Sequence, residues 1–259
     1  MPTPSTQLPC GLLGPSGVSP LFRWADAEDA HTVGLRVAAA LEPQASRILT
    51  NVHLRASWAV RAVRSACLLR EVEKALGPNV AVENTFLVVK FPGVFSVPWH
   101  VDGKDVDFEL DPDHSVSAFL ALSRMDEKNG ALQVLPGSHL EGYEGDLEGP
   151  SLASERDAEL LEMDPGEAVL FDSRILHSSD RNRSHAPRIG LNIRYVTPQG
   201  CVNRSIQAAP LDIVGGQDWP ASGRDQLRYN LFRPPQQRTR SPEPPAPNPP
   251  AAPAETCGT

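Results

Sequence analysis

The sequence contains no uninterrupted apolar run longer than about five residues, whereas a membrane-spanning helix needs roughly twenty. It also has no excess of basic residues, because 24 Lys and Arg stand against 32 Asp and Glu and give a formal net charge of −8. An acidic chain without a basic run lacks the surface by which proteins bind nucleic acids and anionic membranes. We therefore expect a soluble, cytoplasmic protein that binds neither nucleic acid nor membrane.

Cysteine is scarce and forms no motif. The four cysteines lie far apart without a CxxC pair, which indicates neither a zinc knuckle nor a disulfide framework. Residues 1–20 contain no Lys or Arg and are broken by Pro and Gly, so they lack the basic and apolar regions of a signal peptide. We expect a flexible N-terminal segment over these residues.

The last part of the chain, residues 234–259, lacks large aliphatic and aromatic side chains, and nine of its 26 residues are proline. Such a composition cannot form a hydrophobic core, so it predicts a disordered Pro-rich tail. The intervening residues 21–233 are long enough to bury a core of their own, and we expect them to form a single domain.

The pattern of apolar residues changes once along the chain. Three- and four-residue spacings over Ala25 to Leu41 and Ala56 to Leu76 predict two helices, which give a helical layer over residues 25–78. Short β-branched and aliphatic runs then follow, and they predict strands over Asn84 to Lys90, Val97 to Asp102, Val116 to Leu122, Ala131 to Leu135, Ala168 to Asp172 and Ile189 to Val196. Residues Glu155 to Met163 are predicted as an inserted helix. This order favours a mainly β fold with flanking helices, in which residues 79–200 form a double-stranded β-helix (jelly-roll) core.

The most informative stretch is His100-Val101-Asp102. Residues two apart in a strand project from the same face, so His100 and Asp102 can direct an imidazole nitrogen and a carboxylate oxygen to one point. A third ligand from a distant strand would complete the two-histidine, one-carboxylate set used by non-haem Fe(II) oxygenases. Our candidate is His177. The residues that compete for these roles are His31, His53, His114, His139, His185 and Asp172.

Several segments of residues 79–196 occur in an order typical of a known family. They are Val89-Lys90-Phe91-Pro92-Gly93, Pro98-Trp99-His100-Val101-Asp102, Asn129-Gly130-Ala131-Leu132-Gln133-Val134-Leu135-Pro136-Gly137-Ser138-His139, His177-Ser178-Ser179 and Pro187-Arg188-Ile189-Gly190-Leu191-Asn192-Ile193-Arg194-Tyr195-Val196. Together they resemble the phytanoyl-CoA dioxygenase-like family of Fe(II)- and 2-oxoglutarate-dependent oxygenases.

The resemblance implies a role for each matching residue. His100, Asp102 and His177 would bind iron and form the catalytic centre. Arg188 would grip the distal carboxylate of 2-oxoglutarate, assisted by Ser179. A guanidinium suits that task because it is always charged and can meet a carboxylate with two parallel hydrogen bonds.

The reaction implied is the oxidation of an unactivated C–H bond of a small molecule by O2, with release of succinate and CO2. Family members that halogenate lack the carboxylate of the HxD triplet, so Asp102 favours hydroxylation over halogenation. Desaturation, epoxidation and cyclisation use the same residues and stay open. Two other classes are alternatives: a jelly-roll protein without catalysis, and a zinc hydrolase or cupin-type isomerase with the same ligands and a metal-bound water.

The substrate is not encoded in a recognisable motif, although the short chain suggests a small molecule or a step in secondary metabolism. Alternating Asp105, Asp107 and Glu109 form one acidic cluster after the HxD triplet, which leads to the hypothesis of a cationic substrate group, against the alternative of a solvated acidic loop. Alternation along the strand from Arg188 also places Asn192 and Arg194 on the face of Arg188, as candidate substrate contacts. The sequence leaves the oligomeric state open.

Overall fold

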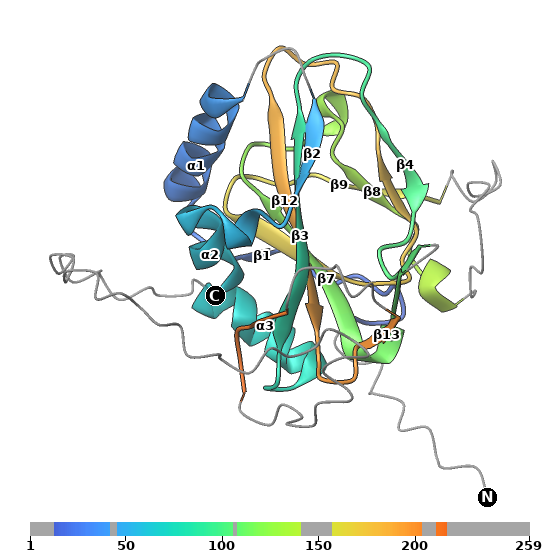
Figure 1. The fold of residues 1–259 in the computed structure, drawn as a ribbon. Coiled ribbons are helices and arrows are strands. Elements are labelled where there is room, and N and C mark those ends of the chain that lie inside the picture. The colour runs from blue at the N-terminus through green and yellow to red at the C-terminus, as the bar shows by residue number, and fades with distance from the viewer. Residues whose placement is uncertain (1–12, 42–45, 106–107, 141–156, 204–210, 217–259) are drawn as a thin grey trace, which may run out of the picture.

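The computed structural model describes residues 13–41, 46–105, 108–140, 157–203 and 211–216. Its helices are α1 (Ala27–Ala40), α2 (Ser57–Val63) and α3 (Ala66–Leu76), with short 3-10 turns at Val52–Leu54, Pro112–His114, Glu127–Asn129 and Ser138–Leu140. Figure 1 shows the three helices on one side of the largest sheet, with strands β4 (Val97–His100) and β8 (Leu132–Val134) on its other side. The described part of the chain is thus a layered, mainly β structure.

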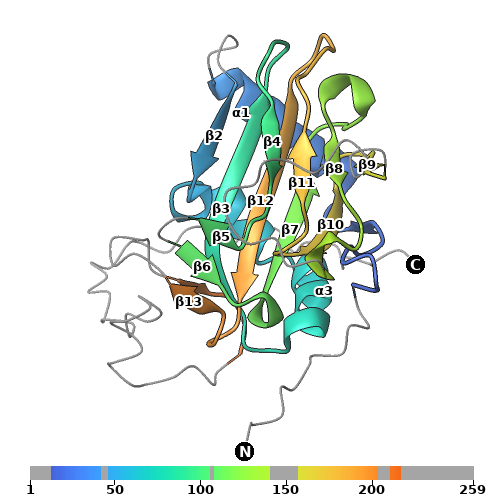
Figure 2. The ribbon, with the colours of Figure 1, turned by 90° about the vertical axis from the view of Figure 1, so that its right-hand side faces the viewer.

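The largest sheet has seven antiparallel strands in the order β1-β10-β7-β12-β3-β14, with β2 also paired to β3. Their bounds are β1 Phe22–Arg23, β2 Arg47–Thr50, β3 Ala81–Lys90, β7 Ser115–Ala121, β10 Glu167–Asp172, β12 Arg188–Val196 and β14 Asp212–Ile213. A second sheet has the order β4-β11-β8-β9, with β11 at His177–Ser179 and β9 at Glu159–Leu161, and a small third sheet joins β13 (Cys201–Asn203), β6 (Phe108–Leu110) and β5 (Lys104–Asp105). In Figure 2 the second sheet lies in front of the first. Two facing antiparallel sheets confirm the predicted double-stranded β-helix core.

The side chains of strand β12 project alternately to the two sides of the large sheet. Ile189, Leu191, Ile193 and Tyr195 pack into the main hydrophobic core together with buried residues of all three helices. The Tyr195 hydroxyl donates to the Val63 carbonyl oxygen of α2 at 2.9 Å. The other face of the strand is directed toward the second sheet, as alternation predicts. The helical layer therefore holds β12 in place from behind.

The helix α1 approaches the sheet very closely at one residue. Gly34 lies in the middle of α1, and a Cβ added to it would come within 2.1 Å of the Leu122 carbonyl oxygen. Only glycine permits this contact, because any side chain would push the helix away from the end of β7.

The helical prediction needs two corrections. The helix predicted over Ala56 to Leu76 is two helices, because Ser65 adopts an extended backbone between α2 and α3 and donates its hydroxyl to the Trp24 carbonyl oxygen. The segment Glu155 to Met163 was predicted as a helix, yet its described part contains strand β9, which pairs in register with β8. Pairing with a neighbouring strand overrides the local helical pattern there. Strand β2 was not predicted, and neither were the short strands β1, β5, β6, β11, β13 and β14.

The chain ends fall largely outside the described residues. Residues 1–12 and 217–259 are outside them, and with them the predicted Pro-rich tail. Of the predicted N-terminal segment, the described residues include Val18, which forms an antiparallel bridge with Phe171 of β10, and Ser19, which donates its backbone N–H to the Leu170 carbonyl oxygen. Among the described helices, none combines the length and apolar character that crossing a bilayer requires.

Candidate metal centre

The second sheet brings the two predicted histidine ligands together. His100 is the last residue of β4 and His177 the first of β11, and the two are direct partners in the antiparallel register. Asp102 follows two residues after His100, and its Oδ1 lies 4.0 Å from His100 Nε2 and 3.8 Å from His177 Nε2. One ligand atom from each residue lies within 4.8 Å of the others, and among the described residues these three make the sole such group of three. The arrangement has the composition of a two-histidine, one-carboxylate metal site.

Each imidazole is oriented by a local hydrogen bond. The Nδ1 of His100 lies 2.8 Å from the Pro98 carbonyl oxygen, and the Nδ1 of His177 lies 2.9 Å from the Ile175 carbonyl oxygen. A carbonyl oxygen can only accept, so Nδ1 carries the proton in both rings and Nε2 is left with its lone pair. Both lone pairs are thereby free for a metal ion, which is how metal-binding histidines are normally held.

The Asp102 carboxylate is buried and surrounded by donors. Its Oδ2 accepts from the Ser117 hydroxyl and, at 2.7 Å, from the Asn192 side-chain amide, whereas its Oδ1 accepts from Arg194 Nη2 at 3.0 Å. Burial alone would raise the pKa of Asp102, but Arg194, the two histidines and Ser117 outweigh it and hold that pKa far below its usual range. The carboxylate therefore stays ionised, with Oδ1 turned toward the histidines.

The His177 side chain is also kept in the form that binds metals. Burial, followed by the proximity of His100, lowers the pKa of His177 to about 4, although Asp102 opposes this change. At neutral pH the imidazole is uncharged and its Nε2 can act as a ligand.

We predict that replacing Ser117 with alanine weakens metal binding without unfolding the protein. The variant removes one of the two donors to Asp102 Oδ2 and leaves the ligand less firmly oriented. Loss of such a supporting contact typically lowers metal affinity by about 10- to 100-fold. Equilibrium titration of metal-free protein with Mn(II) measures this change.

The matched control is Ser115→Ala on the same strand. Its hydroxyl is also buried but bonds to the Asp111 carbonyl oxygen and to Ser173 rather than to Asp102. Equal metal affinities for the two variants would show that the Ser117 contact does not support the ligand.

The three residues open into a cavity of about 340 Å³ between the two sheets. Its walls are largely apolar, and its polar lining consists of the three metal-ligand candidates, two serines, two arginines and one asparagine. The lining residues are Ile48, Phe86, Val88, Val97, Pro98, His100, Asp102, Phe119, Leu132, Phe171, His177, Ser178, Ser179, Arg188, Asn192 and Arg194. Such a cavity can hold a small organic molecule beside the metal-ligand candidates.

Arg188 lines this cavity and has no partner for its charge among the described residues. The residue is 1% exposed, and none of its three guanidinium nitrogens has a hydrogen-bond partner. The guanidinium carbon lies 5.0 Å from the centroid of the Phe119 ring, and burial lowers the pKa of Arg188 to about 9. A buried, unpaired guanidinium is costly unless an anion neutralises it. Ser179 lines the same cavity, so the two residues that the family resemblance assigns to one carboxylate lie in one cavity.

Arg194 and Asn192 also reach the cavity, as predicted from alternation along β12. The guanidinium carbon of Arg194 lies 4.4 Å from the Phe86 ring centroid and 5.3 Å from that of Phe108. Both polar residues contact Asp102, so each has a structural role whether or not a substrate touches it.

The predicted acidic cluster has no place in this cavity among the described side chains. Asp107 lies outside the described residues, and of Asp105 only the backbone, in β5, is described. Glu109 belongs to β6 and does not line the cavity. The hypothesis of a cationic substrate group stays a prediction.

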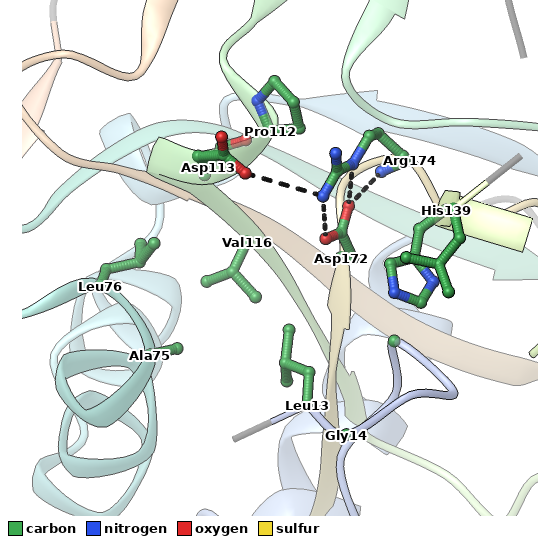
Figure 3. Close-up of a pocket in the computed structure, with 13 residues that line it drawn as sticks. Leu13, Gly14, Ala75, Leu76, Pro112, Asp113, Val116, His139, Asp172 and Arg174 are labelled. Atoms are coloured by element: carbon green, nitrogen blue, oxygen red, sulfur yellow. Dashed lines mark hydrogen bonds and ion pairs between the residues drawn. The ribbon is translucent and has the colours of Figure 1, made fainter. Parts of the chain in front are cut away.

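The residues that competed for the metal site lie elsewhere. Asp172 and His139 line a separate cavity of about 110 Å³, shown in Figure 3, where the Arg174 guanidinium donates two hydrogen bonds and its backbone N–H a third to the Asp172 carboxylate. His114 lies 3.2 Å from the Thr197 hydroxyl, and the Nδ1 of His53 lies 3.0 Å from that of Thr85. In the described part of the chain neither Asp172 nor any of these histidines joins the group around His177.

Sequence reasoning missed Ser117. It stands in the middle of β7, a strand with every residue buried, and a lone serine there carries no motif. The one signal that could have indicated Ser117 is the alternation of residues along β7. Ser117 is the register partner of Arg194 of β12, so the two side chains project from the same face of the sheet.

Comparisons with known proteins agree with this geometry. A family model described as phytanoyl-CoA dioxygenase (PhyH) matches residues 21–190. The peroxisomal phytanoyl-CoA dioxygenase of Bos taurus is 29% identical over 172 residues, which make up 57% of this chain and 50% of that protein. The chain spans half or less of the length of the curated relatives that it matches.

Solved structures of non-haem oxygenases share the fold. The apo structure of the non-heme monooxygenase ThoJ is 26% identical, with a TM-score of 0.63, and the match covers 85% of this chain and 91% of ThoJ. The non-heme alpha ketoglutarate dependent carbocyclase SnoK from nogalamycin biosynthesis is 16% identical, with a TM-score of 0.64 and coverage of 81% and 96%. The second likeness shows the fold alone.

Proposed function

The chain belongs to the phytanoyl-CoA dioxygenase family, and on that basis we propose that it is an Fe(II)- and 2-oxoglutarate-dependent oxygenase that hydroxylates a C–H bond of a small molecule. The observation that carries the proposal is the meeting of two features in one cavity. The His100, Asp102 and His177 side chains present ligand atoms to one point, and the same cavity contains the unpaired guanidinium of Arg188. A metal ion and a carboxylate are the partners that these two features lack.

The donor set fits iron. Two imidazoles and one carboxylate on one side of an octahedral ion leave positions open for other ligands, which is the arrangement of non-haem Fe(II) oxygenases. The bound iron, together with 2-oxoglutarate and O2, would supply the oxidant for the C–H bond, with succinate and CO2 as the other products. We propose His100, Asp102 and His177 as its ligands.

The other residues of the cavity would bind and orient 2-oxoglutarate and the substrate. Arg188 would hold the distal carboxylate of 2-oxoglutarate with two parallel hydrogen bonds, because its donors are buried and have no other described partner. Ser179 lies in the same cavity and would donate its hydroxyl to that carboxylate. The apolar walls, which include Phe86, Phe119 and Phe171, would exclude water around the reacting carbon.

The type of oxidation at the reacting carbon is a further part of the proposal. Asp102 is present and oriented, so no ligand position is vacated for a halide, which favours hydroxylation. Desaturation, epoxidation and cyclisation are alternatives, since the same ligand set would serve them. The proposed substrate is the one that the sequence suggests, a small molecule or an intermediate of secondary metabolism.

The test of the proposed function is co-substrate turnover by purified protein. We expect succinate to form from 2-oxoglutarate slowly with Fe(II) and O2 alone, and faster when a library compound is the substrate. Mass spectrometry of that compound then distinguishes a gain of one oxygen atom from a loss of two hydrogens. Activity that is supported by Zn(II) and independent of 2-oxoglutarate would instead establish a hydrolase. No activity with any metal would favour a protein without catalysis.

A further inference from the structure

A second guanidinium lines the cavity on the same strand as Arg188. Arg194 and Arg188 both belong to β12 and lie six residues apart, so the rise of a strand separates their Cα atoms by about 20 Å. A molecule of 2-oxoglutarate is much shorter than this. Asp102 accepts hydrogen bonds from Asn192 and Arg194, so the metal-ligand candidates lie level with this end of the strand. A co-substrate that extends from them toward Arg188 would leave Arg194 uncovered.

The Arg194 guanidinium is held in place but has a donor to spare. Its carbon lies 4.4 Å from the Phe86 ring centroid and 5.3 Å from that of Phe108, and the side chain is 14% exposed. Contacts with two aromatic rings stabilise a cation. Nη2 donates to Asp102 Oδ1 at 3.0 Å, whereas Nε is buried and has no hydrogen-bond partner in the described part of the chain. A ligand is one way to satisfy that donor.

The charges that line the cavity do not balance once the metal site is filled. Among the described residues that line the cavity, Asp102 is the sole acid. In the metal-free protein its carboxylate pairs with Arg194, but a divalent ion held by His100, Asp102 and His177 would draw on the same charge. The two carboxylates of 2-oxoglutarate would meet the metal and Arg188. Arg194 is then left as a largely buried cation without an anion of its own, which is costly.

We propose that Arg194 binds an anionic group of the substrate, and that the substrate is a small carboxylic acid with an apolar body. The inference rests on the proposed function, because that function supplies the metal and the dicarboxylate that use the other charges. A guanidinium can meet a carboxylate with two parallel hydrogen bonds. Ile48, Phe86 and Pro98 line the same cavity and offer apolar contacts to the rest of the molecule. Because Arg194 touches Asp102, the carbons beside the carboxylate would lie near the metal-ligand candidates.

This substrate is opposite in charge to the cationic group suggested by the acidic residues after the HxD triplet. Of those residues, Glu109 follows Phe108 directly in β6. Neighbours in a strand project to opposite faces, and the Phe108 ring contacts Arg194, so Glu109 is directed away from Arg194. The described residues therefore favour an anion, and one experiment distinguishes the two charges.

Paramagnetic relaxation measures which charge the cavity accepts. Protein saturated with Mn(II) and 2-oxoglutarate is mixed with hydrocinnamate, its primary amide or phenylpropylamine, which share one apolar body and differ in charge. Bound Mn(II) enhances the relaxation of nearby probe protons, so NMR detects even weak binding beside the metal. Hexanoate and its amide form a second pair with a flexible body. We expect each acid to bind about tenfold or more tightly than its uncharged or cationic counterpart.

Three variants separate substrate binding from support of the metal ligand. Arg194→Gln should bind acid and amide equally, whereas Arg194→Lys, which keeps the charge, should retain part of the preference. Arg124→Gln alters an exposed cation that pairs with Glu162 and Asp164, and it should behave as wild type. All comparisons are made at saturating Mn(II), and the Mn(II) affinity is measured separately. A role confined to Asp102 would change that affinity but not the ratio between the probes.

The possible outcomes distinguish this inference from the proposed function. Equal binding of acid and amide by the wild type, no binding of any acid while 2-oxoglutarate stays bound, or an unchanged preference in Arg194→Gln would each overturn the role of Arg194. Tighter binding of the amine would overturn it in favour of the cationic group. All of these results leave the proposed function intact. Protons of 2-oxoglutarate that show no relaxation enhancement with the Mn(II) protein would contradict the proposed function itself.

Discussion

Replacing Arg188 with methionine is expected to weaken 2-oxoglutarate binding by about 100-fold or more and, at the same time, to stabilise the ligand-free protein. Two charge-assisted hydrogen bonds to a carboxylate contribute about 1.5–3 kcal/mol each, and the variant loses both. In the ligand-free protein the same guanidinium is 1% exposed, has no partner for its nitrogens and lies near the Lys90 ammonium. A well-packed apolar side chain removes that cost, and replacements of this kind stabilise folds by about 1–4 kcal/mol.

Urea unfolding without ligand and calorimetric titration with 2-oxoglutarate measure the two effects on the same protein. Arg183→Met is the matched control, because Arg183 is exposed and pairs with Asp180 at the surface, so neither quantity should change strongly. A less stable Arg188→Met variant would show that the guanidinium has a partner in the free protein. Unchanged affinity would remove Arg188 from the co-substrate subsite.

The second large effect is expected from His177→Ala, which should abolish iron binding and all turnover of 2-oxoglutarate. His177 is buried at 3% exposure, and its Nε2 lies 3.8 Å from Asp102 Oδ1, so the variant leaves two ligands where three converge. A chelate reduced to two protein ligands should bind Fe(II) at least about 100-fold more weakly. Metal analysis after dialysis and Mn(II) titration give the affinity.

The exposed histidine of the loop before β12 offers the control. His185→Ala removes an imidazole of the same kind far from the described ligand group, and it should retain full metal binding. Circular dichroism of both variants separates lost binding from lost folding. A folded His177→Ala protein that still binds one metal ion tightly would place the metal elsewhere.

The part of the fold that sequence predicts best is the strand with the clearest alternation. Ile189, Leu191, Ile193 and Tyr195 pack against the helices, and Arg188 and Asn192 line the cavity, as a period of two requires. The helix break at Ser65 and the strand β9 depend on contacts with Trp24 and with β8, which lie far away in the chain. Local spacing carries no record of such partners, so those elements were not predictable from it.

The residues of the site likewise include some that the sequence predicts and others that depend on distant contacts. The sequence predicted that a strand would run through both His100 and Asp102, but β4 ends at His100, and the Asp102 backbone N–H donates to the Ser173 carbonyl oxygen instead. The meeting of these two residues with His177 depends on the register between β4 and β11. The donors that converge on Asp102 come from β7 and β12, and no motif joins Ser117 to them.

The measurement that tests the central claim most directly is anaerobic addition of Fe(II) and 2-oxoglutarate to metal-free protein, followed by visible absorption spectroscopy. Chelation of a 2-oxo acid to Fe(II) gives a metal-to-ligand charge-transfer band. We predict that the band appears in the wild type, is absent from His177→Ala and is weakened in Arg188→Ala at equal co-substrate concentration. A well-folded wild-type protein that binds Fe(II) but shows no band would contradict the assignment of this cavity to iron and 2-oxoglutarate.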